Sequence, residues 1–224
     1  MRKRRCAGFA ARRHYGDALT LAEKIRYLQV QAATRSNLGN LCLVENRLAE
    51  AMEHNARSFE LAGQAGDVRS QAIALENLAL GHIALMQYAE AGECLRSARN
   101  LARKIGDTER LLSLDLVEIE QLISELEGRN LAPEGGKPDA VLGTPSNALW
   151  TQALERLDSA RDALEPRGLL GELPRVLRLR VRALRGAGNE AEAREALKEG
   201  LAVCAEQQNH AEELRLRRLE GTTT

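Results

Sequence analysis

Apolar residues recur at three- and four-residue spacing along most of this chain, which is the pattern of amphipathic α-helices. The clearest case follows Asp107, where leucine and isoleucine form one stripe: Leu112, Leu116, Ile119, Ile123 and Leu126. No stretch shows the sustained two-residue alternation that is typical of a half-buried β-strand. The pattern therefore predicts helix nearly throughout.

A unit of forty residues occurs twice in succession. Residues 31–70 and 71–110 align without a gap and are identical at twelve positions, whereas chance would give about 4 at average composition. The shared positions include Asn37 and Asn77, and each copy closes with Gly-Asp, at residues 66–67 and 106–107. A period of this length indicates stacked supersecondary units that each contact only their neighbours.

Each unit divides into two predicted helices. The pairs are 31–44 with 47–64, and 69–85 with 88–105. Gly66 and Gly106 can adopt positive φ after a helix, and Asp67 and Asp107 can cap the helix that follows. The second helix of each pair carries a bulky residue three positions before an alanine, as in Tyr88-x-x-Ala91. The two then share one helical face.

The pattern extends to both sides of the two copies. The first clear helix is expected to begin near His14. A third pair starts at 109–127, is interrupted by residues 128–147 with three prolines, and resumes at Trp150. A fourth pair is expected at 170–186 and 189–208, followed by a last helix at 210–220. The predicted organisation is a basic segment (1–14), a repeat array of about four units (15–220) with an insertion loop (128–147) within the third, and a tail (221–224). The loop is either functional or disordered.

The large and small residues of the second copy resemble those of the tetratricopeptide repeat: Leu75, Leu78, Ala79, Tyr88, Ala91, Leu95 and Ala98. The forty-residue length and the Asn-Leu dipeptides at 37–38 and 77–78 are similar to the variety in Pins-like G-protein signalling modulators and kinesin light chains. The resemblance implies an all-α, right-handed superhelical solenoid of antiparallel helix pairs. It also implies a concave groove, lined by the first helix of each pair, in which family members usually hold peptides.

Composition narrows the function further. Thirty-two basic and thirty-two acidic residues cancel, which argues against general binding to nucleic acid or to an anionic membrane. No apolar run approaches the roughly 20 residues of a membrane-spanning helix. The four cysteines and four histidines lack the spacing of metal ligands, and no catalytic or phosphate-binding motif is present. We therefore expect no enzyme activity, no cofactor and a cytoplasmic protein. The basic N-terminus allows a nuclear or mitochondrial address, or is simply a solvated end.

Three asparagines are candidate peptide-binding residues. The resemblance places Asn37, Asn40 and Asn77 in the groove, with Asn37 and Asn77 at matching positions of the two copies. An amide offers both donors and an acceptor, so a ladder of amides can pair with a peptide backbone of any sequence. The alternative is that each amide bonds to a neighbouring repeat and stiffens the stack. Both interpretations stay open at this point.

Four arginines form the second candidate site. Arg175, Arg178, Arg182 and Arg185 are three, four and three residues apart, so they share one face of a helix, which the resemblance places in the groove. A guanidinium suits carboxylate or phosphate, which predicts a partner with acidic or phosphorylated residues. Alternatively, the acids of the preceding first helix neutralise the arginines internally: Asp115, Glu118, Glu120, Glu125 and Glu127.

These observations predict a non-catalytic scaffold or adaptor that binds a peptide segment of another protein. The alternative is a regulatory or sensor module of a larger enzyme or transcription regulator. The identity of the partner, the pathway and the oligomeric state have no signal in the sequence.

Overall fold

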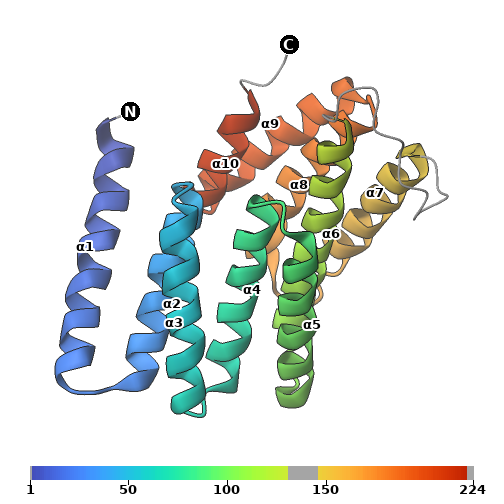
Figure 1. Cartoon of the computed structure of the whole chain (residues 1–224). Helices are drawn as coiled ribbons and strands as arrows, with labels where there is room; N and C mark the ends of the chain where they lie inside the picture. Colours follow the sequence, from blue (N-terminus) through green and yellow to red (C-terminus); the bar gives the residue numbers. More distant parts are fainter. Residues whose placement is uncertain (1, 131–145, 221–224) are drawn as a thin grey trace. The chain divides into compact units, whose positions relative to one another are not determined.

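The computed structural model describes the backbone of residues 2–130 and 146–220, and the side chains of residues 10–129 and 147–220 within them. Over these residues the fold is all-α and contains no strand (Figure 1). The helices are α1 (Arg2–Lys24), α2 (Leu28–Val44), α3 (Leu48–Gln64), α4 (Val68–Ala84), α5 (Tyr88–Ile105), α6 (Thr108–Asn130), α7 (Ser146–Asp162), α8 (Leu173–Gly186), α9 (Glu190–Glu206) and α10 (His210–Glu220). A short 3₁₀ turn, Leu170–Glu172, precedes α8.

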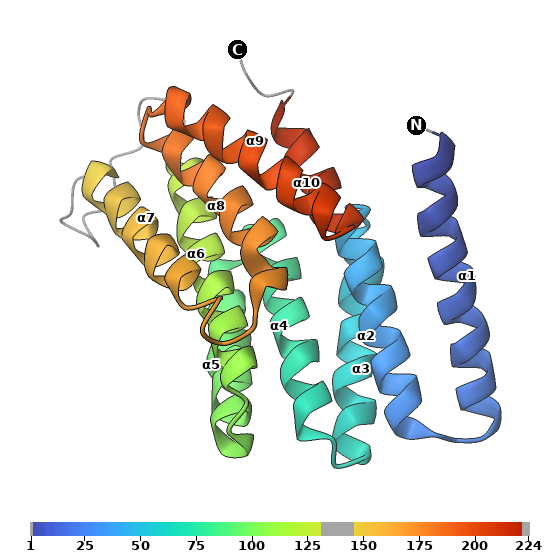
Figure 2. The same ribbon diagram turned by 180° about the vertical axis from the view of Figure 1, so that it is seen from behind.

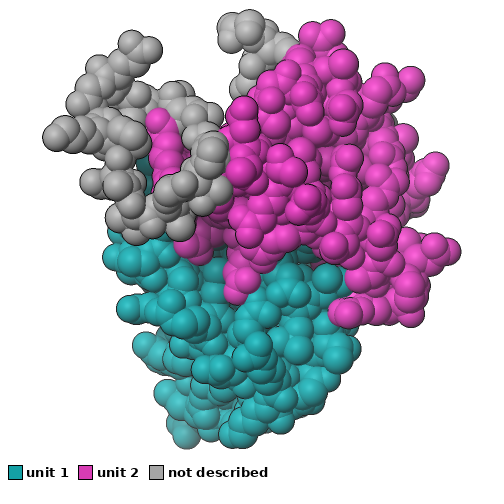
Figure 3. Space-filling model, turned by 90° about the vertical axis from the view of Figure 1, so that its right-hand side faces the viewer, with its two compact units in different colours: residues 1–117 teal, residues 118–224 magenta. Residues whose placement is uncertain are grey.

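The chain forms two compact units, residues 1–117 and 118–224, with the boundary inside α6 (Figure 3). In unit 1 each of the helices α1 to α5 packs against the next, and α2 also packs against α4. Figures 1 and 2 show these helices side by side with alternating direction. The two forty-residue copies thus fold as two antiparallel helix pairs, α2 with α3 and α4 with α5.

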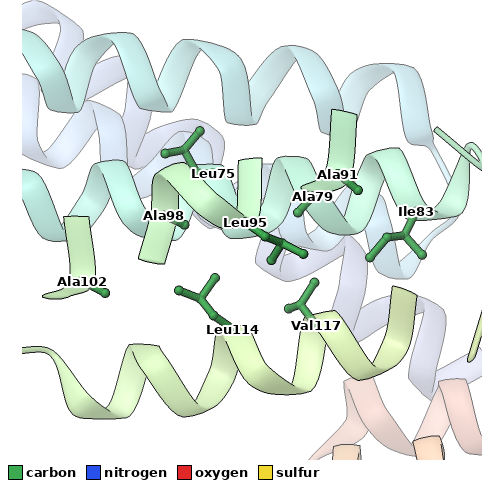
Figure 4. Packing of buried hydrophobic residues seen from close by; sticks show 9 residues of the cluster. All are labelled: Leu75, Ala79, Ile83, Ala91, Leu95, Ala98, Ala102, Leu114 and Val117. Atoms are coloured by element: carbon green, nitrogen blue, oxygen red, sulfur yellow. The ribbon is translucent and has the colours of Figure 1, made fainter. Parts of the chain in front are cut away.

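Small side chains let these helices approach closely. Figure 4 shows the core formed by α4, α5 and the first part of α6, where alanines face leucine, isoleucine and valine. Ala79, Ala91, Ala98 and Ala102 are fully buried there. An alanine three positions after the bulky residue at the start of α5 brings a methyl group to the contact, as the sequence pattern predicts.

The turns between the helices share one backbone geometry. Gly66 and Gly106 both have φ of 67°, and the amide of the following residue bonds back to the carbonyl of Ala62 or Ala102 at 2.9 Å. This is the Schellman arrangement, which satisfies carbonyls that the helix end leaves unpaired. Asp67 Oδ1 accepts from the Ser70 amide at 3.0 Å, so it caps α4. The predicted roles of glycine and aspartate at these turns are confirmed.

In unit 2, α8 packs against both α7 and α9, and α10 packs against α9 and α8. Trp150 on α7 is almost fully buried and lies against Gly186 at the end of α8. A Cβ at Gly186 would lie 2.3 Å from the indole ring, so this glycine makes room for the tryptophan.

The observed helix limits lie close to the predicted ones in both units, with two differences. Helix α1 begins at Arg2, ahead of the expected start near His14, so the basic segment and the first helix are continuous in the backbone. Helices α6 and α7 occupy both ends of the predicted loop at 128–147. The remainder of that loop, 131–145, and the tail, 221–224, lie outside the described residues.

Candidate functional site

The arginine row of α8 lies on one helical face because its members are three or four residues apart. The intervening apolar residues Leu177, Val181 and Leu184 are fully buried on another face. Pro174 stands in the first turn of α8, where its missing N–H is not needed. The helix therefore presents guanidiniums along one side and anchors itself in the core along the other.

Arg178 is the centre of a buried ion-pair network. Its side chain is 7% exposed, and its guanidinium donates to both oxygens of Glu120 on α6, at 2.9 and 3.2 Å. Its Nε donates to Glu212 on α10 at 2.7 Å. Glu212 also pairs with Arg215, one turn further along α10. One arginine thus joins three helices, and the fork geometry with Glu120 is the strong bidentate form.

The other three arginines of the row are also paired. Arg182 donates twice to Glu127, at 3.1 and 2.6 Å, and to Ser124 at 2.8 Å. Arg175 lies 3.6 Å from Glu120. Arg185 donates to the Leu219 carbonyl at 2.7 Å and lies 3.4 Å from Glu190.

The charges of the network shift its titration. Burial alone would raise the pKa of Glu120, but the nearby charges of Arg178 and Arg175 outweigh burial and hold its pKa far below the usual range. The pKa of Glu212 is lowered in the same way, because Arg178 and Arg215 outweigh its burial. Both carboxylates are therefore charged at neutral pH, and they form ion pairs with the arginines of the network.

The structure settles how the arginines are neutralised. Glu120 and Glu127, two of the acids predicted as internal partners, pair with the row, so the internal alternative is confirmed for these contacts. Of the other predicted acids, Asp115 pairs with Arg99, and Glu118 lies 3.4 Å from Arg156. A peptide-binding role for Arg175, Arg178, Arg182 and Arg185 stays a prediction. In this state Arg175 and Arg178 are buried instead of open to a partner.

Glu212 is the member of the network that sequence reasoning missed. The acids considered as partners were all on the helix that precedes α8 in the array, whereas Glu212 is on α10. A usable signal was present: Glu212 stands four residues before Leu216, so a carboxylate and an apolar residue share the inward face of a short helix.

The three asparagines lie in different environments. Asn37 and Asn40 are exposed on α2. Asn77 on α4 is partly buried and donates to Ser36 at 3.1 Å and to Asn55 at 3.2 Å. For Asn77 the predicted hydrogen bond to a neighbouring repeat is therefore present, while its Oδ1 can accept a further hydrogen bond. A ladder of amides that pairs with a peptide backbone stays a prediction, and Asn77 differs from its equivalent Asn37 in its bonds to Ser36 and Asn55 of the preceding pair.

Asn55 and Ser36 are the unforeseen residues that hold Asn77. Asn55 is fully buried, and its Nδ2 donates to the Ala51 carbonyl at 2.8 Å. Gly39 on α2 leaves the room for it, since a Cβ there would lie 2.4 Å from the Asn55 amide. The sequence signal was Asn55 itself, a polar residue at a repeat position where larger apolar residues are usual.

Uncharged residues of α2 and α4 form a surface that we term the amide strip, in which Ala33, Asn37 and Asn40 correspond to Ile73, Asn77 and Leu80 at the forty-residue period. None of its members is charged: Val30, Ala33, Asn37 and Asn40 on α2, and Ile73, Asn77, Leu80 and Ala84 on α4. Those on α2 and Ala84 are exposed, and the other three on α4 are partly exposed. Ion pairs adjoin the strip on α4: Arg69, four residues before Ile73, pairs with Asp107, and Glu76, next to Asn77, pairs with Arg110.

Metal-binding side chains do not gather in the described part of the chain. No cluster of three or more histidine, cysteine, aspartate or glutamate side chains there could hold a metal ion. His82 Nδ1 lies 2.9 Å from Gln87 Oε1. Burial and the charge of Arg35 lower the pKa of His54. Within residues 2–130 and 146–220, no helix combines the length and apolar character needed to cross a membrane.

The sequence was also compared with protein families and with curated proteins. No protein-family model matches the sequence, and no curated protein matches it either. The resemblance to tetratricopeptide repeats thus rests on the residues of the two copies and on their helix pairs.

Proposed function

We propose that this chain is a non-catalytic scaffold or adaptor of the tetratricopeptide type, and that it binds an extended peptide segment of another protein on the amide strip. The right-handed superhelix of that family is part of the proposal. The observation that carries it is the uncharged, exposed or partly exposed surface on α2 and α4, in which Ala33, Asn37 and Asn40 correspond to Ile73, Asn77 and Leu80 of the next repeat.

The chemistry of the strip suits a peptide backbone. Asn37 and Asn40 present free-standing amides that can both donate and accept. Asn77 is already oriented by its hydrogen bonds to Ser36 and Asn55, so the binding of a peptide to its side-chain carbonyl would cost little further conformational entropy. Ala33 and Ala84 leave space for side chains of the bound segment. The acidic character expected of the partner is not required by this surface, which has no cationic residue.

A displayed library of random peptides, selected on the full chain, tests the proposal. Selected peptides should lose about tenfold or more in affinity on the double substitution Asn37→Ala/Asn40→Ala, since each hydrogen bond contributes about 1 kcal/mol. Both residues are exposed, so the fold should be unaffected. The matched control is Asn100→Ala, an exposed asparagine on α5.

Two results would contradict the proposal. One is a library that yields no enriched sequence family on the folded chain. The other is a selected peptide that binds the Asn37→Ala/Asn40→Ala chain as tightly as it binds the wild type.

A further inference from the structure

Helix α10 contacts two arginines of the α8 row, one through a side chain and one through its backbone. Glu212 accepts from Arg178 Nε at 2.7 Å, and the Leu219 carbonyl accepts from Arg185 Nη1 at 2.7 Å. Between these polar contacts, Leu216 is fully buried in the cluster that contains Val181 and Leu184. We term the surface beneath α10 the arginine seat: Arg178, Val181, Leu184 and Arg185.

Helix α10 buries few of its residues. It has 11 residues, of which only Glu212 and Leu216 are buried. A helix this short is not stable in water without packing. The turn that leads into it places Gln208 at φ 55°, a conformation that disfavours residues other than glycine. Detachment of α10 from unit 2 would therefore expose few buried residues, and we expect it to cost less free energy than detachment of α8 or α9.

Departure of α10 would leave no buried charge without a partner. Arg178 would keep its two hydrogen bonds to Glu120, and Arg185 would keep Glu190 at 3.4 Å. The Glu212 carboxylate would return to water. Loss of one partner from a buried ion pair is usually costly because it strands the other charge, and here Glu120 removes that cost.

We propose that the arginine seat is a docking site for an acidic amphipathic helix of another protein, and that α10 is its tethered occupant in the isolated chain. The incoming helix would place a carboxylate on Arg178 and, four residues later, a leucine in the apolar cluster that Val181 and Leu184 form with Ala196 and Cys204 of α9. The chemistry is the one that α10 itself demonstrates. This proposal uses unit 2 alone and does not depend on the amide strip.

A peptide added in trans tests whether the seat accepts another helix. The probe is a fluorescent, end-capped peptide of residues 209–220. A second probe keeps only Asn209, Glu212, Leu216 and Leu219 and has alanine or lysine elsewhere. The control probe carries the substitutions Glu212→Gln and Leu216→Ala. Binding to the full chain is measured by fluorescence anisotropy.

The full-length variant Leu216→Ala weakens the hold on α10 and should open the seat. It should bind both probes about tenfold or more tightly than wild type, because a larger fraction of molecules has a vacant seat. Leu214→Ala is the matched control, since Leu214 is on the same helix but 37% exposed. Addition of Arg178→Met to the open variant should abolish binding.

Equal binding of the probes to the folded Leu216→Ala and Leu214→Ala chains would overturn the proposal, and so would equal binding of the control probe. If Leu216→Ala does not fold, hydrogen exchange of the wild-type chain decides. The proposal requires the α10 amides to exchange before those of α8, and exchange of both helices in one step overturns it. Formation of a dimer that depends on Glu212 would assign the seat to a second copy and overturn it as well.

Discussion

The substitution Arg178→Met tests whether the buried network stabilises unit 2. Arg178 makes three charge-assisted hydrogen bonds to two carboxylates and is almost fully buried. Removal of one member of such a pair typically costs 3–5 kcal/mol because the other charge stays buried. Here Glu120 retains Arg175 at 3.6 Å and Arg182 at 3.4 Å. We therefore expect the lower end of that range, about 3 kcal/mol.

Urea unfolding followed by tryptophan fluorescence measures this loss. Trp150 is the single tryptophan of the chain, is 1% exposed and belongs to unit 2, so its emission reports on that unit. A loss of about 3 kcal/mol should lower the midpoint by about 1.5 M urea at an ordinary slope. The slope itself should not change.

Arg180→Met is the matched control on the same helix. Arg180 is 25% exposed and pairs with Asp158, which is 56% exposed, so its loss should cost less than about 1 kcal/mol. Equal midpoints for the Arg178 and Arg180 variants would refute the reasoning. The triple variant Arg178→Met/Glu120→Gln/Glu212→Gln should regain part of the loss, because it removes the carboxylates that the single substitution strands.

Three further outcomes follow from the geometry. Gly186→Ala should destabilise unit 2 by about 1–3 kcal/mol, measured by the same fluorescence, because its methyl group would overlap the Trp150 ring. Met86 has φ of 60°, so Met86→Gly should raise stability by about 1 kcal/mol, while Gly106→Ala, at φ 67°, should lower it by a similar amount; thermal unfolding by circular dichroism checks both. The folded-state pKa of Glu120 is lowered from its ordinary value of 4.5, so its stabilising effect is present above that pH and is lost below it. The stability difference between wild type and Glu120→Gln should therefore shrink as the pH falls from 4.5, which urea unfolding across that range measures.

The helices were predictable because local signals mark both their faces and their ends. Glycine and aspartate at 66–67 and 106–107 fix two turns, and the apolar period fixes the buried sides. The start of α1 was not predictable in this way. Its first turns contain a run of arginines with no apolar period, and arginine is itself a good helix former.

The candidate site was predictable only as far as it lies within one helix. The spacing of Arg175, Arg178, Arg182 and Arg185 gave their common face. The pairing with Glu120 required the side-by-side placement of first helices, which the family resemblance supplied. The contact with Glu212 depends on how α10 turns back onto α8, and the spacing of Glu212 and Leu216 marks only a common face of α10 and not that path. Likewise, Asn77 differs from Asn37 because Ser36 and Asn55 of the preceding pair lie beside it.

The positive-φ residues reveal a shorter period than the forty-residue repeat. They stand at Arg26, Asn46, Gly66, Met86 and Gly106, twenty positions apart, and again at Gly168, Gly188 and Gln208. After each of these residues the next amide bonds to a carbonyl five residues before it, whichever residue has the positive φ. The period is therefore a property of the turn geometry, and it is hidden in the sequence at the four turns whose positive-φ residue is not glycine: Arg26, Asn46, Met86 and Gln208. The same spacing would put a turn at position 126, but α6 continues through this position to Asn130. Leu126 is buried there, whereas the positive-φ turn residues are exposed. Because α6 continues beyond position 126, Glu127 is part of this helix and its carboxylate lies 2.6 Å from the Arg182 guanidinium.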